Sequence, residues 1–163
     1  MYLLDTNVFI EAKNTYYGFD TAPGFWEWVT DQNAAGNLAS VPEVRSEMTA
    51  GNDDLAAWVS GLPSTFWLPD TVEKLASVTQ LSMWAAGRSD HFRPEAISEF
   101  LGSADMRLIA AAGAAGHTVV SHERRHDDAK KKVPIPNACA AINVPYQNPH
   151  RLFRRLGLHL VQP

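Results

Sequence analysis

The sequence has little cysteine, no long apolar run and no large excess of either charge. Cys139 is the single cysteine among 163 residues, so no internal disulfide can form, which fits a reducing compartment. No apolar run approaches the roughly 18 residues of a transmembrane helix. No charged leader with an apolar core precedes the first expected strand at Tyr2, so we expect no signal peptide. Together these absences predict a cytoplasmic protein without a membrane span.

The formal net charge of −4 gives no general attraction to nucleic acid. A nucleic-acid partner would therefore have to be bound by a local basic patch or through metal ions. The hydrophobic content of 45% is enough for a full core. The chain has an ordinary length for one domain and shows no internal repeat and no low-complexity segment, so we expect a single domain over residues 1–163.

Three short apolar segments predict buried strands, at residues 2–4, 37–41 and 118–121. The first lacks polar alternation, which is typical of a strand covered on both faces. Strands that alternate with helices over one domain favour an α/β fold with a parallel sheet. Residues 16–23 are expected to form a loop, and residues 133–136 an extended segment, because prolines disfavour a helix there. The predicted helices are 7–13, 25 to about 33–36, 42–50, 53–60, 72–84, 95–101, 104–115, 137–142 and 151–156.

Acidic residues follow each of the predicted strands. Asp5 ends the first strand, Glu43 and Glu47 lie on the helix after the second, and Glu123 follows the third. Asp105 lies in the first turn of the alanine-rich helix. Because the carboxyl ends of parallel strands meet at one edge of a sheet, where ligands gather, we expect these side chains to lie close together.

Clustered carboxylates repel one another, by about 1 kcal/mol for each pair in water and more in a cleft. A fold that gathers several of them needs compensation, and hard divalent cations with oxygen ligands, Mg²⁺ or Mn²⁺, supply it. Such a site can activate water and hold the oxygens of a phosphodiester, in some enzymes with two ions roughly 3.5–4 Å apart. The acidic pattern therefore predicts metal-dependent phosphodiester hydrolysis.

Several segments resemble the motifs of PIN-domain nucleases, in the same order. Leu3-Leu4-Asp5-Thr6-Asn7-Val8-Phe9-Ile10 resembles the opening motif of that family, and Pro42-Glu43-Val44-Arg45-Ser46-Glu47-Met48 is similar to the second. Ala104 to Ala112 resembles the third acidic motif, and Val119-Val120-Ser121-His122-Glu123 the fourth. The tail Lys132 to Cys139 is similar to a PIN-like subfamily often encoded in prokaryotic toxin–antitoxin pairs.

This resemblance implies a three-layer α/β/α sandwich around a central parallel sheet. It implies a metal-dependent endoribonuclease that uses Mg²⁺ or Mn²⁺, of the kind that forms the toxin of a type II toxin–antitoxin system. The implied partners are an RNA substrate, a cognate antitoxin protein and a second copy of the chain in a homodimer. The chain is longer than the smallest toxins of the family. The additional length lies in residues 51–101, which we expect to form a helical insertion or cap.

The resemblance also assigns roles to single residues. The metal-binding and catalytic residues would be Asp5, Glu47, Asp105 and Glu123. Supporting residues would be Asn7, Ser121 and Glu43. Two choices stay open: Glu43 is an alternative to Glu47 as the second acid, and Asp127 or Asp128 to Glu123 as the fourth.

A basic cluster lies close behind the fourth acid. Arg124, Arg125, Lys130 and Lys131 are expected to hold RNA phosphates, with help from Lys132, Arg151, Arg154 and Arg155. Two other functions are compatible with the sequence. One is a catalytically inactive PIN-like module that binds RNA or protein. The other is a haloacid dehalogenase-type phosphohydrolase with Asp5 as nucleophile, although such enzymes need an acid where Asn7 stands.

Overall fold

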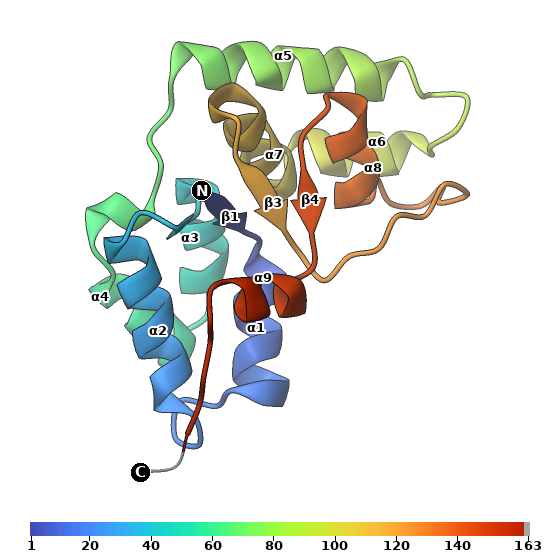
Figure 1. Ribbon diagram of the computed structural model, residues 1–163. Coiled ribbons are helices and arrows are strands. Elements are labelled where there is room, and N and C mark those ends of the chain that lie inside the picture. The colour runs from blue at the N-terminus through green and yellow to red at the C-terminus, as the bar shows by residue number, and fades with distance from the viewer. Residues whose placement is uncertain (162–163) are drawn as a thin grey trace.

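The computed structural model describes residues 1–161, and one four-stranded parallel sheet lies at its centre (Figure 1). The strand order is β2-β1-β3-β4. Tyr2 lies opposite both Leu38 and Thr118, so the central strand β1 is paired on both edges. The strands are β1 (Tyr2–Leu4), β2 (Leu38–Ala39), β3 (Thr118–Val120) and β4 (Tyr146–Gln147).

Helices occupy most of the rest of the described chain. Before the third strand these are α1 (Thr6–Glu11), the π-helical turn η1 (Ala12–Tyr16), α2 (Pro23–Ala34), α3 (Pro42–Thr49), α4 (Asp54–Gly61), the 3₁₀ turn η2 (Ser64–Phe66), α5 (Val72–Ala86), α6 (Pro94–Leu101) and α7 (Ala104–Ala115). After it come α8 (Ile135–Ala141) and α9 (Pro149–Arg155).

Helices cover both faces of the sheet, which confirms the predicted three-layer α/β/α architecture. On one face α2 packs against β2 and meets α9 through Phe25 and Phe153, whose ring centroids are 5.4 Å apart. On the other face α7 packs against β3 and also contacts α3 and α8, while α5 lies along its outer side (Figure 1). Leu3, Val119 and Ile109 are fully buried between these layers.

The chain changes direction across the sheet at β1. From β1 it passes to β2 on one edge, and it then returns through α3 to α7 to β3 on the other edge. Such a switch point is where open α/β sheets bind ligands, outside the carboxyl ends of the strands. Asp5 and Ser121 directly follow β1 and β3, and the backbone N–H of Asp5 donates to the carbonyl of Val120 at 3.0 Å.

Two proline segments differ from the sequence-based predictions. Residues 133–136 were expected to be extended throughout, but α8 already begins at Ile135 with Pro136 in its first turn. Likewise Pro23, expected in a loop, is the first residue of α2. The N–H groups of a first helical turn have no partner within the helix, so proline loses no hydrogen bond there.

The second strand is shorter than predicted and the fourth was not predicted. Only Leu38 and Ala39 form β2, while Ser40 makes an isolated parallel bridge with Trp67. The two-residue strand β4 is too short for an alternation pattern to identify it.

The predicted helical insertion, residues 51–101, contains α4, η2, α5 and α6. Of these, α4 packs against α3, and α5 packs along α7. Across residues 1–161 the structure has no helix that is both long and apolar enough to cross a bilayer.

Candidate metal and catalytic site

Asp5 occupies the turn between β1 and α1. It is the N-cap residue of α1, with extended backbone angles, yet its side chain caps no backbone N–H of that helix. Only 1% of the residue is exposed. Its Oδ2 accepts a 2.8 Å hydrogen bond from the hydroxyl of Ser121. The hydrogen bond from Ser121, at the end of the neighbouring strand, therefore helps to orient the carboxylate.

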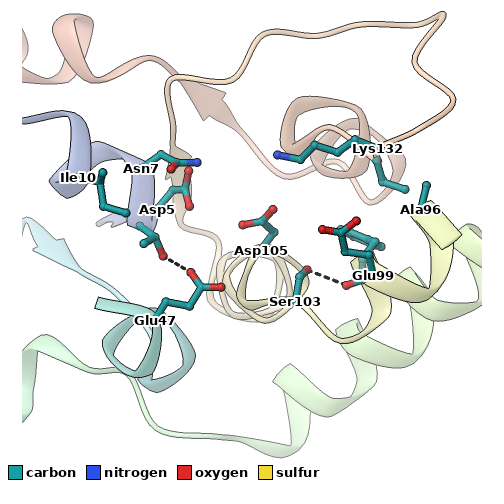
Figure 2. A pocket seen from close by; sticks show the side chains of 12 residues that line it. Asp5, Asn7, Ile10, Glu47, Ala96, Glu99, Ser103, Asp105 and Lys132 are labelled. Atoms are coloured by element: carbon teal, nitrogen blue, oxygen red, sulfur yellow. Dashed lines mark hydrogen bonds between the residues drawn. The ribbon is translucent and has the colours of Figure 1, made fainter. Parts of the chain in front are cut away.

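Asp105 is presented by the start of α7. Ser103 is the N-cap residue, and its hydroxyl accepts from the N–H of Met106 at 3.2 Å and donates to the carbonyl of Phe100 at 2.7 Å. Asp105 is the second residue of the helix, where the helix dipole favours a negative charge. Because Ser103 already caps the helix, the carboxylate of Asp105 is left to face the space beside Asp5 (Figure 2).

The two glutamates of α3 point to different neighbours. Glu47 accepts a hydrogen bond from the hydroxyl of Thr6, the residue after Asp5. Glu43 instead lies 3.4 Å from Nζ of Lys74, a buried lysine on α5. Glu47 lines the same cavity as Asp5 and Glu43 does not, which makes Glu47 the better placed of the two candidates for the second acid.

Hydrogen bonds to its carboxylate and to its backbone fix Glu123 in place. Its Oε2 accepts from the N–H of Ile135, the first residue of α8, at 2.8 Å, and its Oε1 accepts from Nζ of Lys132. Its own N–H donates to the hydroxyl of Ser121 at 3.2 Å, and its carbonyl accepts from the hydroxyl of Tyr146. Asp127, considered as an alternative acid, is exposed and bonded to Arg125, so it does not join this arrangement.

These elements enclose a cavity of roughly 380 Å³ beside the carboxyl end of β1. Figure 2 shows Asp5 and Asp105 directing their carboxylates into it, with Glu47 on one side and Lys132 opposite. The residues that line it are Asp5, Thr6, Asn7, Ile10, Glu47, Ala96, Glu99, Phe100, Ser103, Asp105, Lys132 and Val133.

The predicted acids influence one another electrostatically. Burial raises the pKa of Asp5 to about 6, and the hydrogen bond from Ser121 offsets this only in part. Burial also raises the pKa of Asp105 to about 7, with the charge of Asp5 as the next contribution. The charges of Glu123 and Glu47 raise the pKa of both aspartates further. The acids named from the sequence are therefore close enough in the structure to change the pKa of Asp5 and Asp105.

The donor set of this cavity suits a hard divalent cation. It offers carboxylate oxygens from Asp5, Asp105 and Glu47, together with the amide oxygen of Asn7, and oxygen ligands are those that Mg²⁺ and Mn²⁺ prefer. Within residues 1–161 neither Asp5 nor Asp105 forms a direct ion pair, and Lys132 acts on Asp105 only through its charge at longer range. In the same part of the chain no three acidic, histidine or cysteine side chains converge closely enough to share one ion, and Glu47 is hydrogen-bonded to Thr6.

Among the cavity residues that were not assigned to the site from the sequence, three have polar side chains that act on the acids or add to them: Glu99, Thr6 and Lys132. Glu99 of α6 adds a further carboxylate from the predicted insertion, and Thr6 holds Glu47. Lys132 was expected only to help with RNA phosphates but lines the cavity itself, where its charge lowers the pKa of Asp105. A signal for Glu99 exists, since it lies three residues after Ala96 and therefore on the same side of α6, although Glu99 itself is exposed.

The basic residues predicted to bind RNA phosphates are all exposed. Arg124 and Arg125 border a second groove on the far side of Glu123. Lys130 and Lys131 lie on the loop before α8 and line neither hollow. The structure thus separates the predicted basic cluster into two parts.

A protein-family model described as "Domain of unknown function (DUF4411)" matches residues 2–160. The chain belongs to the DUF4411 family. Neither the curated proteins nor the solved structures contain a match to it.

Proposed function

We propose that this DUF4411 protein is a PIN-like, metal-dependent endoribonuclease that hydrolyses RNA phosphodiester bonds in the cytoplasm. The observation that carries the proposal is the pair Asp5 and Asp105. Both are desolvated, both face one cavity at the switch point of a parallel sheet, and within residues 1–161 neither forms a direct ion pair, although Lys132 lines the same cavity. A fold keeps such a pair where a divalent cation compensates it.

The residues of the cavity have distinct roles in this proposal. Asp5 and Asp105 would hold Mg²⁺ or Mn²⁺, with Glu47 turning from Thr6 to complete the set. When bound, the ion supplies Lewis-acid stabilisation of the phosphoryl oxygens and promotes ionisation of the attacking water. Ser121 orients Asp5, while Lys132 is positioned to contact a phosphate oxygen at the mouth of the cavity.

We further propose that the protein is the toxin of a type II toxin–antitoxin pair, with a cognate antitoxin and a homodimeric assembly. The support is the similarity of residues 132–139 to PIN-like toxins. In the structure this segment is part of the site, because Lys132 binds Glu123 and Val133 lines the cavity. A protein that covers this segment would block access to Asp5 and Asp105.

Induced expression of the wild type and of Asp5→Asn in bacteria tests this function. The wild type is expected to arrest growth and to create new RNA 5′ ends at a small set of sites, and Asp5→Asn is expected to do neither. New ends that appear equally with both proteins, or with neither, would contradict the proposal. Asp31→Asn, on the exposed side of α2, is a matched control that should behave as the wild type does.

One observation favours a second candidate, a PIN-like module that binds RNA without cutting it. Glu123 is already engaged by Lys132 and by the N–H of Ile135, which leaves it less free to serve as a ligand. Calorimetry separates the two functions. Heat from Mn²⁺ binding that disappears in Asp5→Asn favours the nuclease, whereas RNA binding without any Mn²⁺ binding favours the module.

A further inference from the structure

A second hollow of roughly 610 Å³ lies at the carboxyl ends of β3 and β4, and we call it the His122 groove. Glu123 lines this groove and accepts a hydrogen bond from Lys132, which lines the acidic cavity. The groove is therefore next to the acidic cavity. Its lining residues are Glu11, Tyr16, His122, Glu123, Arg124, Arg125, Tyr146, Gln147, Asn148, His150 and Arg151.

The groove carries cationic groups at its rim. Arg124 and Arg151 are exposed and form no ion pair within residues 1–161, whereas Arg125 is paired with Asp127 at 2.7 Å. Arg124 follows Glu123 directly, and Arg151 comes from the first turns of α9. Two free guanidinium groups on one hollow suit the oxygens of a phosphate.

Aromatic and imidazole rings form one side of the groove. The ring centroid of His150 lies 5.7 Å from that of Tyr16 and also 5.7 Å from that of His122. Nε2 of His122 is 3.5 Å from a carboxylate oxygen of Glu11, which orients the imidazole. Tyr16 is 50% exposed, so a face of its ring is available to a planar ligand.

One buried polar side chain that lines the groove lacks a hydrogen-bond partner for its amide nitrogen. Gln147 of β4 is only 9% exposed, and its Nε2 has no hydrogen-bond partner within the described chain. A buried amide without a partner is unfavourable, so most buried polar groups are paired with protein or water. The backbone of Gln147 is fixed, because its carbonyl accepts from the N–H of Ser121.

We propose that the His122 groove binds one nucleotide of single-stranded RNA, adjacent to the bond that the acidic cavity cuts. Arg124 and Arg151 hold its phosphate, and its base stacks on Tyr16. An unpaired nucleotide joins a phosphate and a flat apolar ring in one unit, and the groove offers a matching group for each. This inference rests on the proposed nuclease function for the position of the nucleotide relative to the cut.

The test is the binding of a fluorescein-labelled RNA hexanucleotide to the full chain in EDTA, where metal-dependent cleavage cannot occur. Arg124→Gln and Arg151→Gln are each expected to reduce the slope of log affinity against log salt by about 0.7. Tyr16→Ala is expected to weaken binding by at least about fivefold, because it removes one stacked base. Arg93→Gln is the matched control, since Arg93 is exposed and lies outside the groove.

The outcomes separate the groove from the nuclease. If the groove variants bind the hexanucleotide as the wild type does while the wild type still cuts RNA with Mn²⁺, the groove assignment is overturned and the nuclease stands. If they lose affinity but the wild type cuts no RNA with Mn²⁺, the groove is supported and the nuclease is overturned. Circular dichroism of each variant excludes unfolding as the cause of lost affinity.

Discussion

The hydroxyl of Ser121 donates a 2.8 Å hydrogen bond to Oδ2 of Asp5, and so joins the ends of two strands that are distant in sequence. The same hydroxyl accepts a 3.2 Å hydrogen bond from the N–H of Glu123. Ser121 is fully buried. One small side chain therefore positions two of the predicted acids, and a residue that touches no substrate contributes to the geometry of the site.

Replacing Ser121 with alanine is expected to destabilise the protein and to weaken the site. The loss of both hydrogen bonds of this hydroxyl should lower the free energy of unfolding by about 1–3 kcal/mol in urea denaturation. The hydrogen bond lowers the pKa of Asp5, so without it that pKa should rise and Mn²⁺ binding should require a higher pH. Ser46→Ala, which removes a hydroxyl from the exposed side of α3, is the control. An unchanged pH profile of Mn²⁺ affinity would refute the positioning role.

The raised pKa values of Asp5 and Asp105 determine how the stability of the metal-free protein depends on pH. In the unfolded chain both pKa values return to about 3.8, so the folded state binds more protons between that pH and about 6 to 7. These two groups therefore make folding less favourable as pH rises through this window. This loss of stability is complete above about pH 7 and absent below about pH 4.

Asp5→Asn tests this linkage directly. In chelator near pH 8 the variant should be more stable than the wild type by on the order of 1–3 kcal/mol, and near pH 4 the difference should vanish. Urea denaturation at the two pH values gives the comparison. Saturating Mn²⁺ should make the wild type the more stable protein near pH 8, because only the wild type would bind the ion and be stabilised by it. A variant that is less stable than the wild type in chelator at both pH values would contradict the assignment.

A pair of substitutions on α3 distinguishes its two glutamates. Glu47→Gln should weaken Mn²⁺ binding at least about tenfold, the loss expected for a direct carboxylate ligand. Glu43→Gln should leave Mn²⁺ affinity unchanged, because Glu43 pairs with Lys74 away from the cavity. Isothermal titration calorimetry measures both. The reverse pattern would show that Glu43 is the second acid.

Among the described residues, Lys132 is the cationic side chain that lines the acidic cavity. Its removal should favour binding of the divalent cation. Burial alone would lower the pKa of Lys132, but its hydrogen bond with Glu123 and the charges of Glu123, Asp105 and Asp5 raise it. Lys132→Met should therefore tighten Mn²⁺ binding by about 1 kcal/mol, or about fivefold. Lys131→Met, one residue away and exposed, should not. Weaker Mn²⁺ binding in Lys132→Met would mean that this lysine supports the site and does not compete with the ion.

The parts of the fold that depend on local patterns could be predicted from the sequence. The apolar run before Asp5 predicts the central buried strand, and Ser103 and Gly116 mark both ends of α7, where Gly116 has a φ of 66°. The strand β4 and the early start of α8 could not be predicted. The strand β4 has only two residues. The start of α8 could not be predicted because proline is compatible with a first helical turn but not with later turns, and the sequence does not show which turn Pro136 occupies.

Three acids that line the cavity, Asp5, Glu47 and Asp105, were named from the sequence, whereas Glu99 and the contacts of all four were not. Glu43 and Glu47 both follow the second strand, and only packing against α5 shows that Glu43 meets Lys74. Glu99 and Lys132 reach the cavity from segments that no motif connects with Asp5. Such contacts follow from the tertiary arrangement of α6 and of the loop before α8.

RNA cleavage by the purified protein tests the central claim most directly. A labelled single-stranded RNA is incubated with the wild type and with Asp5→Asn, each in Mn²⁺ and in EDTA, and the products are resolved on a gel. The account predicts cleavage by the wild type in Mn²⁺ alone, with activity lost in EDTA and reduced at least about a hundredfold in Asp5→Asn. Equal cleavage in EDTA, or full activity of Asp5→Asn, would contradict it.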